Sequence, residues 1–126
     1  MSLNLHKFRE DTTNIQLCCH QVLNRILDLM VKHPKHATHL NKYSKACLVT
    51  ERLCEYVSHG CCNSIGLSNH IVSECHLKCN EMVDCCETIM SCGLSKDDCK
   101  YLRCVEMKSL CDSVLGKKKS KSKKRK

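Results

Sequence analysis

Residues 74–92, "ECHLKCNEMVDCCETIMSC", place five cysteines at spacings that match the turns of an α-helix. Positions four and seven residues apart share one face of a helix, because successive residues are rotated by about 100°. The residues on that face follow at steps of four, three, four and three: Cys75, Cys79, Met82, Cys86 and Ile89. This stretch therefore predicts a helix that buries thiols where an ordinary helix buries leucine.

The spacing Cys-x-x-Cys does not occur among the 14 cysteines of the 126-residue chain. That spacing suits a loop or a helix start that wraps around one metal ion. Spacings of four and seven residues instead suit helices that project sulfur into a shared interior. The pattern thus favours thiols that face the inside of a helical protein.

Glycine occurs four times and proline once, so the chain has few breaks and strands with tight turns are not indicated. The segments between the breaks predict four helices, at residues 11–32, 38–60, 68–91 and 96–115, and residues 1–10 are left open as an extension of the first. Ser95 and Asp98 form a near capping box at the start of the last one. Short connections make neighbouring helices antiparallel. We therefore expect an all-α protein, an up-down-up-down four-helix bundle with a cysteine-lined core.

The three other expected helices also carry rows that face inward. In the first, the row is Ile15, Cys19, Val22, Ile26 and Met30, and His33 continues it. In the second, the row steps by seven through Leu40, Cys47, Cys54 and Cys61. In the fourth, it consists of Cys104, Met107 and Cys111, with Val114 near it.

The antiparallel order also predicts which residues meet. One end of the bundle should gather Cys18, Cys19, Cys61, Cys62, Cys75, Cys79 and Cys111. The other end should gather Met30, His33, Cys47, Cys85, Cys86, Met90 and Cys99. Cys54 and Cys104 are expected between the two ends.

The first residues, "MSLNLHKFREDTTNIQ", contain no apolar run of signal-peptide length, and charges interrupt them. No segment approaches the ~20 apolar residues of a membrane span. We therefore expect a cytoplasmic protein with no membrane partner, in a reducing compartment where thiols stay free or bind metal. A processed or otherwise exported form is left open.

The last ten residues, "KKKSKSKKRK", hold eight basic residues, and the other 13 Lys and Arg are balanced by 13 Asp and Glu. This division predicts a cysteine-rich domain at residues 1–116 and a disordered tail at residues 117–126, since the tail has nothing apolar to bury. Such a tail can act as a solubiliser, as a nuclear localisation signal or as a phosphate-binding arm. A nuclear location, and nucleic acid or a nuclear import factor as partner, are therefore kept open.

A core filled with cysteine requires a stabilising agent. Each replacement of leucine by cysteine forfeits about 1 kcal/mol or more of apolar burial, and the chain has one Phe and no Trp to compensate. A single buried cysteine is explained equally well as a small hydrophobe. Whole rows of buried cysteines are not explained in this way.

Cu(I) fits such an interior best, because it is a soft ion that favours thiolate and thioether ligands. Zinc needs four ligands in a tetrahedron, and one or two such sets are conceivable with histidines as partners. Disulfides are disfavoured in a reducing compartment, and iron–sulfur clusters prefer Cys-x-x-Cys runs in loops.

Three stretches carry most of the thiols at helical spacing: "ACLVTERLCE" (46–55), "CHLKCNEMVDCC" (75–86) and "CKYLRCVEMKSLC" (99–111). In these stretches, and in length, the chain resembles the four-helix-bundle copper storage proteins, which fill their core with Cu(I)–thiolate sites. The resemblance covers most of residues 15–115. The chain departs from that family in having two alanines and one Cys-x-x-x-Cys pair, Cys75/Cys79, so fewer or differently arranged sites are expected.

The expected function is storage or detoxification of several Cu(I) ions by core thiolates. The expected main ligands are Cys47, Cys54, Cys61, Cys75, Cys79, Cys86, Cys104 and Cys111, and Cys19, Cys62, Cys85 and Cys99 extend the row. We expect no enzyme, since no phosphate loop, nucleophile elbow or paired-carboxylate motif occurs. The alternative is a zinc- or disulfide-stabilised helical interaction protein whose basic tail binds nucleic acid, and self-association into a homo-oligomer is left open.

Overall fold

The computed structural model describes residues 5–60 and 69–116. Its regular elements are α1 (Leu5–Lys32), the 3-10 turn η1 (Pro34–His36), α2 (Ala37–Glu55), the π-helical turn η2 (Tyr56–Gly60), α3 (Asn69–Ser91), α4 (Lys96–Tyr101) and α5 (Cys104–Val114). The all-α expectation is confirmed for these residues. None of their helices combines the length and the apolar composition that a membrane crossing requires. The predicted tail at 117–126, Cys61 and Cys62 lie outside the described ranges.

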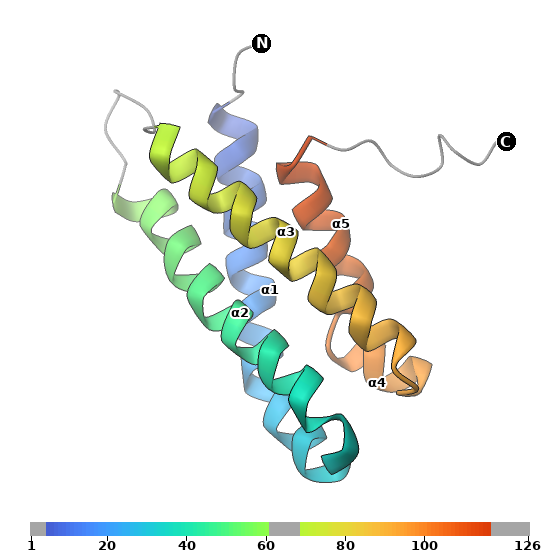
Figure 1. Cartoon of the computed structure of the whole chain (residues 1–126). Coiled ribbons are helices and arrows are strands. Elements are labelled where there is room, and N and C mark those ends of the chain that lie inside the picture. Colours follow the sequence, from blue (N-terminus) through green and yellow to red (C-terminus); the bar gives the residue numbers. More distant parts are fainter. Residues whose placement is uncertain (1–4, 61–68, 117–126) are drawn as a thin grey trace, which may run out of the picture.

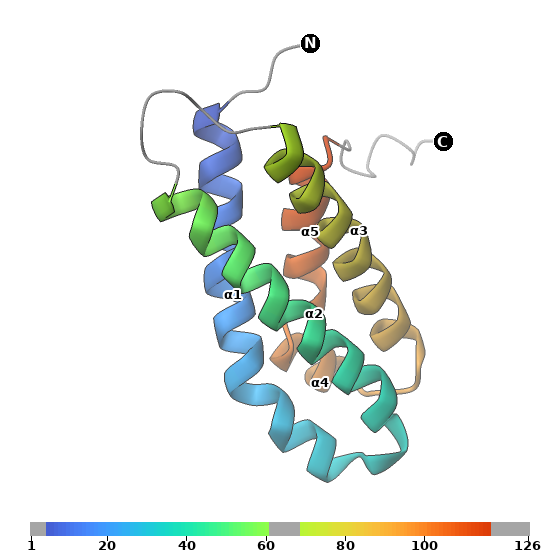
Figure 2. The same ribbon diagram turned by 60° about the vertical axis from the view of Figure 1, so that its left-hand side comes forward.

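The helices α1, α2, α3 and α5 lie side by side around one core (Figure 1). α1 packs on α2 and α3 packs on α5, while α2 contacts α3 and α1 contacts α5. A second view shows the same order, with α4 beneath α5 (Figure 2). We call the end where α1 begins and α5 finishes the upper end, and the end that holds η1 and α4 the lower end.

The single helix expected at residues 96–115 is two helices, α4 and α5, which are separated at Leu102 and Arg103. Arg103 has a left-handed backbone with φ of 54°, a conformation that is uncommon for residues with a Cβ atom. The Tyr43 hydroxyl donates a buried hydrogen bond of 3.0 Å to the carbonyl oxygen of Leu102. The break is therefore a buried joint, held by α2, and apolar periodicity alone does not reveal it.

The rows expected to face inward are buried in α2, α3 and α5. They are Leu40, Cys47 and Cys54 in α2, Cys75, Cys79, Met82, Cys86 and Ile89 in α3, and Cys104, Met107, Cys111 and Val114 in α5. α1 buries Ile15, Cys19, Val22 and Ile26 as expected, but its row ends at Leu29 instead of Met30, and Cys18 is buried as well. The buried face of α1 is wider than one row because α1 contacts both α2 and α5.

Polar contacts join the helices at both ends of the core. At the upper end, the Ser113 hydroxyl of α5 donates to the Asp11 carboxylate of α1 at 2.9 Å. At the lower end, His33 Nε2 lies 3.0 Å from a carboxylate oxygen of Asp98 in α4. The N–H of Asp98 donates to the Ser95 hydroxyl at 3.0 Å, so the N-cap expected from the sequence is confirmed. These contacts hold the first helix against the last two.

Candidate metal centre

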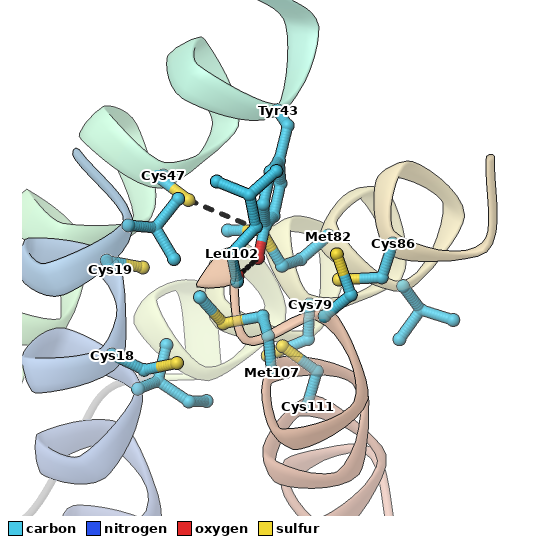
Figure 3. Close-up of a cluster of buried hydrophobic side chains, with 14 of the residues drawn as sticks. Cys18, Cys19, Tyr43, Cys47, Cys79, Met82, Cys86, Leu102, Met107 and Cys111 are labelled. Carbon is cyan, nitrogen blue, oxygen red and sulfur yellow. Dashed lines mark hydrogen bonds between the residues drawn. The ribbon is translucent and has the colours of Figure 1, made fainter. Parts of the chain in front are cut away.

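The described residues include 12 of the 14 cysteines, and all 12 are free thiols. Nine of these thiols are buried: Cys18, Cys19, Cys47, Cys54, Cys75, Cys79, Cys86, Cys104 and Cys111. They come from α1, α2, α3 and α5, and Met82 and Met107 lie among them (Figure 3). The interior of this protein is thus lined with sulfur from every helix that borders the core.

Buried thiols face each other in pairs across the helix interfaces. The paired residues are Cys19 of α1 with Cys47 of α2, Cys79 of α3 with Cys111 of α5, and Cys86 of α3 with Cys104 of α5, each pair within hydrogen-bonding reach. Figure 3 shows Cys79 beside Cys111 at the centre of the core. Every pair joins two different helices, so folding alone brings the sulfurs together. We refer to them as the three thiol pairs.

The three thiol pairs are close enough to influence one another. Cys111 interacts electrostatically with Cys86 and with Cys19, in addition to its hydrogen bond with Cys79. Cys19 in turn interacts with Cys79. Because electrostatic interactions fall off with distance, these influences indicate that the pairs lie near one another in the core.

Further sulfur extends the pairs along α2 and α3. The Cys47 Sγ atom lies 4.0 Å from the Met82 Sδ atom, which connects α2 to α3 (Figure 3). Cys54 interacts with Cys75, and both interact with Cys79. Together these thiols form what we call the thiol row: Cys54, Cys75, Cys19, Cys47, Cys79, Cys111, Cys86 and Cys104.

Burial keeps most of these thiols protonated. Desolvation raises the pKa of Cys75 to about 12 and that of Cys18 to about 11, and it raises the pKa of Cys54 further. A thiolate at Cys54 or Cys75 would lose its solvation without gaining a positive partner, whereas Arg103 partly offsets the effect of burial at Cys18. A cation bound among the sulfurs would supply that partner and replace the protons.

Cys104 differs from the other thiols of the row. Its pKa is lowered because the Cys86 thiol hydrogen-bonds to it, whereas the pKa of Cys86 is raised by that hydrogen bond and by burial. Tyr43 lies beside this pair, and burial and the neighbouring thiols raise the pKa of its hydroxyl. Cys104 is also the first residue of α5, where helix N–H groups favour negative charge. Cys104 is therefore the sulfur of this pair that carries negative charge most readily.

The expected placement of Cys47 at the lower end is wrong. Cys47 instead pairs with Cys19, which was expected at the upper end. α1 begins at Leu5, within the segment 1–10 that was left open as an extension of the helix expected from residue 11, so Cys19 lies near the middle of the helix rather than near its beginning. The two thiols therefore meet at mid-height of the core.

Two predicted ligands lie outside the thiol row, and two buried residues were not assigned to the site. Cys85 is half-buried beside Lys42, in a groove between α2 and α3. Cys99 of α4 is also half-buried, but it interacts with Cys104. The structure adds Tyr43 and Cys18, which is buried and interacts with Cys19 and Cys104. Helical spacing from neighbouring core residues could have identified both: from Ile15 to Cys18, and from Leu40 to Tyr43.

No group of three or more His, Cys, Asp or Glu side chains within residues 5–60 and 69–116 already stands ready to hold a metal ion. These described residues instead bring buried sulfur atoms together in pairs. Two thiolates are sufficient for a soft monovalent ion such as Cu(I). A tetrahedral zinc site needs four ligands, and the described residues do not assemble such a set.

Comparisons of the chain with protein-family models, with curated proteins and with solved structures found no match. The resemblance to the copper storage proteins therefore rests on the pattern of residues. Chemically, the fold and the site define a helical protein with a thiol-lined interior.

Proposed function

We propose that the protein stores or detoxifies Cu(I) ions in the core of a four-helix bundle, with α4 and α5 together as the fourth helix. The observation that carries this proposal is the set of three thiol pairs. Each pair offers two soft sulfur ligands from two helices, in a buried place. Cu(I) favours such ligands and is satisfied by two of them.

The chemistry of the core is suited to holding this ion. Each Cu(I) that binds displaces thiol protons, and its positive charge offsets the desolvation that raises the pKa of the free thiols. Pairs that span two helices also couple binding to folding, because the unfolded chain does not hold the sulfurs together. Loaded protein should accordingly be more stable than the protein without metal. A reducing cytoplasmic compartment, which keeps thiols free, fits this chemistry.

The proposed ligands follow from the geometry. The thiol row supplies the main set, and the Met82 thioether adds a soft donor beside Cys47. Cys18 joins the set because it is buried and interacts with Cys19 and Cys104. Cys99 extends the row at the lower end. Cys85 remains a predicted ligand at the edge of the core, as do Cys61 and Cys62 outside the described residues.

The proposal is tested by titrating the fully reduced protein with Cu(I) under anaerobic conditions, in the presence of a competing chelator. We expect tight uptake of several equivalents per chain. Saturation at one or two equivalents, with zinc recovered from the purified protein, would contradict storage of copper and favour the zinc-stabilised alternative. Mass spectrometry after alkylation without reductant reports whether any thiols are already joined as disulfides.

A further inference from the structure

A groove opens at the lower end of the core, between the end of α3 and the α4–α5 pair, with a volume of about 580 Å³. Three of the residues that line it carry sulfur: Met90, Cys99 and Cys104. Cys104 belongs to a thiol pair with Cys86, and the half-buried Cys99 interacts with Cys104. This sulfur-lined groove therefore lies directly outside the thiol row, whose member Cys104 is itself fully buried.

The rim of the sulfur-lined groove is basic. Lys96, Lys100 and Arg103 line it, together with a single acid, Glu106. Arg103 is already paired with Glu106. Within the described part of the chain, the ammonium groups of Lys96 and Lys100 have no ion-pair or hydrogen-bond partner. Two lysine ammonium groups that take part in no ion pair among the described residues thus line a groove that also carries soft donors.

The lysines and the sulfur donors of the groove together favour the binding of copper as an anionic complex. In a thiol-rich solution Cu(I) is carried as a complex with small thiols, and complexes with glutathione-like thiols are anionic because of their carboxylates and thiolates. We infer that the sulfur-lined groove is the loading site of the protein, and that it accepts Cu(I) from an anionic complex of a low-molecular-weight thiol. This inference rests on the proposed function and names the species that delivers the metal.

Transfer proceeds by exchange of ligands without any change of oxidation state. The complex docks on Lys96 and Lys100, and the Cys99 sulfur forms a bond to Cu(I) while one bond from Cu(I) to the carrier breaks. The proton of the Cys99 thiol leaves with the released carrier thiolate. In the second exchange Cu(I) forms bonds to the Cys104 and Cys86 sulfurs, which already face each other, while its bonds to Cys99 and to the remaining carrier thiolate break. The two displaced thiol protons go to the Cys99 thiolate and to the released carrier thiolate. From this pair Cys111 is the next thiol of the row.

A second groove provides a matched control. It lies between α2 and α3, has a volume of about 620 Å³, and is also lined by lysines, including Lys42 and Lys45. Its single sulfur comes from Cys85, and no member of the thiol row lines it. Charge reversal there changes the net charge of the protein by the same amount as reversal at Lys96 and Lys100, without touching the sulfur-lined groove.

The experiment follows loading of the reduced full-length protein in a stopped-flow instrument, under anaerobic conditions, by the ultraviolet absorbance of Cu(I)–thiolate bonds. The probes are Cu(I)–glutathione, which is anionic, and Cu(I)–acetonitrile, which is cationic. Lys96→Glu/Lys100→Glu should load from Cu(I)–glutathione about tenfold or more slowly than the wild type, the scale of electrostatic steering. Lys42→Glu/Lys45→Glu should stay within about twofold of the wild type, because its charges lie away from the path.

With Cu(I)–acetonitrile, the Lys96/Lys100 variant should not be slower than the wild type, since that probe has no anionic group to attract. Equal rates from Cu(I)–glutathione for the two double variants would overturn the inference. So would a wild-type rate for Cys99→Ala. If charge reversal lowers the final copper capacity through misfolding, Lys96→Gln/Lys100→Gln replaces it, with a smaller slowing expected. A wild-type protein that binds no copper would refute the proposed function itself, whereas full capacity with unchanged rates would refute only this route.

Discussion

The hydroxyl of Tyr43 in α2 donates a hydrogen bond of 3.0 Å to the carbonyl oxygen of Leu102, and both residues are fully buried. This bond satisfies a backbone acceptor where α4 and α5 separate. In Tyr43→Phe the acceptor stays buried without its donor, so the free energy of unfolding should fall by about 1–3 kcal/mol. Urea denaturation of the reduced, metal-free protein measures the change.

Tyr101→Phe is the matched control for this prediction. The Tyr101 hydroxyl lies on the surface, 3.4 Å from an Asp28 carboxylate oxygen. Its loss should cost less than about 0.5 kcal/mol, as is usual for surface substitutions. If both variants unfold at the same urea concentration, the bond between Tyr43 and Leu102 does not stabilise the joint.

Removal of one member of a thiol pair should reduce copper binding. Cys79 pairs with Cys111 and also interacts with Cys75, so it lies at the centre of the row. Cys79→Ala should lose at least one equivalent of Cu(I) in the competition titration, because a two-sulfur site retains only one soft ligand. Cys92→Ala removes a half-buried thiol outside the row and should keep the full capacity. Equal losses in the two variants would show that position in the row does not matter.

The metal-free protein should lose stability at alkaline pH. The pKa of Cys75 is raised from 9.0 to about 12 and that of Cys18 from 9.0 to about 11, in both cases chiefly by burial. Below pH 9 both thiols are protonated in the folded and the unfolded chain, so their contribution to stability is fully present. As the pH rises through the range between the unfolded and the folded pKa, the unfolded chain releases these protons first and becomes favoured.

The measurement for this prediction is the urea midpoint of the reduced, metal-free protein at several values between pH 8 and 11. Cys18→Ala/Cys75→Ala should show a shallower decline, because two of the responsible groups no longer titrate. The two proteins differ only at these two positions, which makes the comparison specific to the thiols. If the urea midpoints of the two proteins fall equally with pH, Cys18 and Cys75 are not responsible for the loss of stability.

The Thr50 hydroxyl is buried in α2, on the face that carries Cys47 and Cys54, and it has no hydrogen-bond partner among the described residues. Thr50→Val replaces this hydroxyl by a methyl group of similar shape, so the metal-free protein should gain about 1 kcal/mol. Thr12→Val is the control, because the Thr12 hydroxyl donates to the Arg9 carbonyl at 3.1 Å. That variant should be neutral or less stable, and a reversed order of the two midpoints would contradict the argument.

Much of the helical framework could be predicted from the sequence, since burial follows periodicity in α2, α3 and α5. The joint at Leu102 and Arg103 could not, because neither glycine nor proline marks it and its main support is Tyr43, a residue far away in the chain. The pairing of Cys19 with Cys47 was also missed, because it depends on where the first helix begins. Asn4, a residue type that is favoured at N-caps, stands directly before Leu5 in the sequence and could have indicated this earlier start. The periodic signal thus located the helical segments, but it revealed neither the relations between helices nor the division of the last segment into α4 and α5.

The division of the three thiol pairs among the helices limits how far the chain can be shortened. A synthetic peptide of α3 would contain Cys79 and Cys86 but neither of their partners, which both lie in α5. A fragment that keeps α3, α4 and α5 would retain two pairs, whereas α1 and α2 hold the remaining one. The smallest piece able to reproduce a paired site is therefore a helical hairpin, and the whole arrangement is a property of the tertiary fold rather than of any single segment.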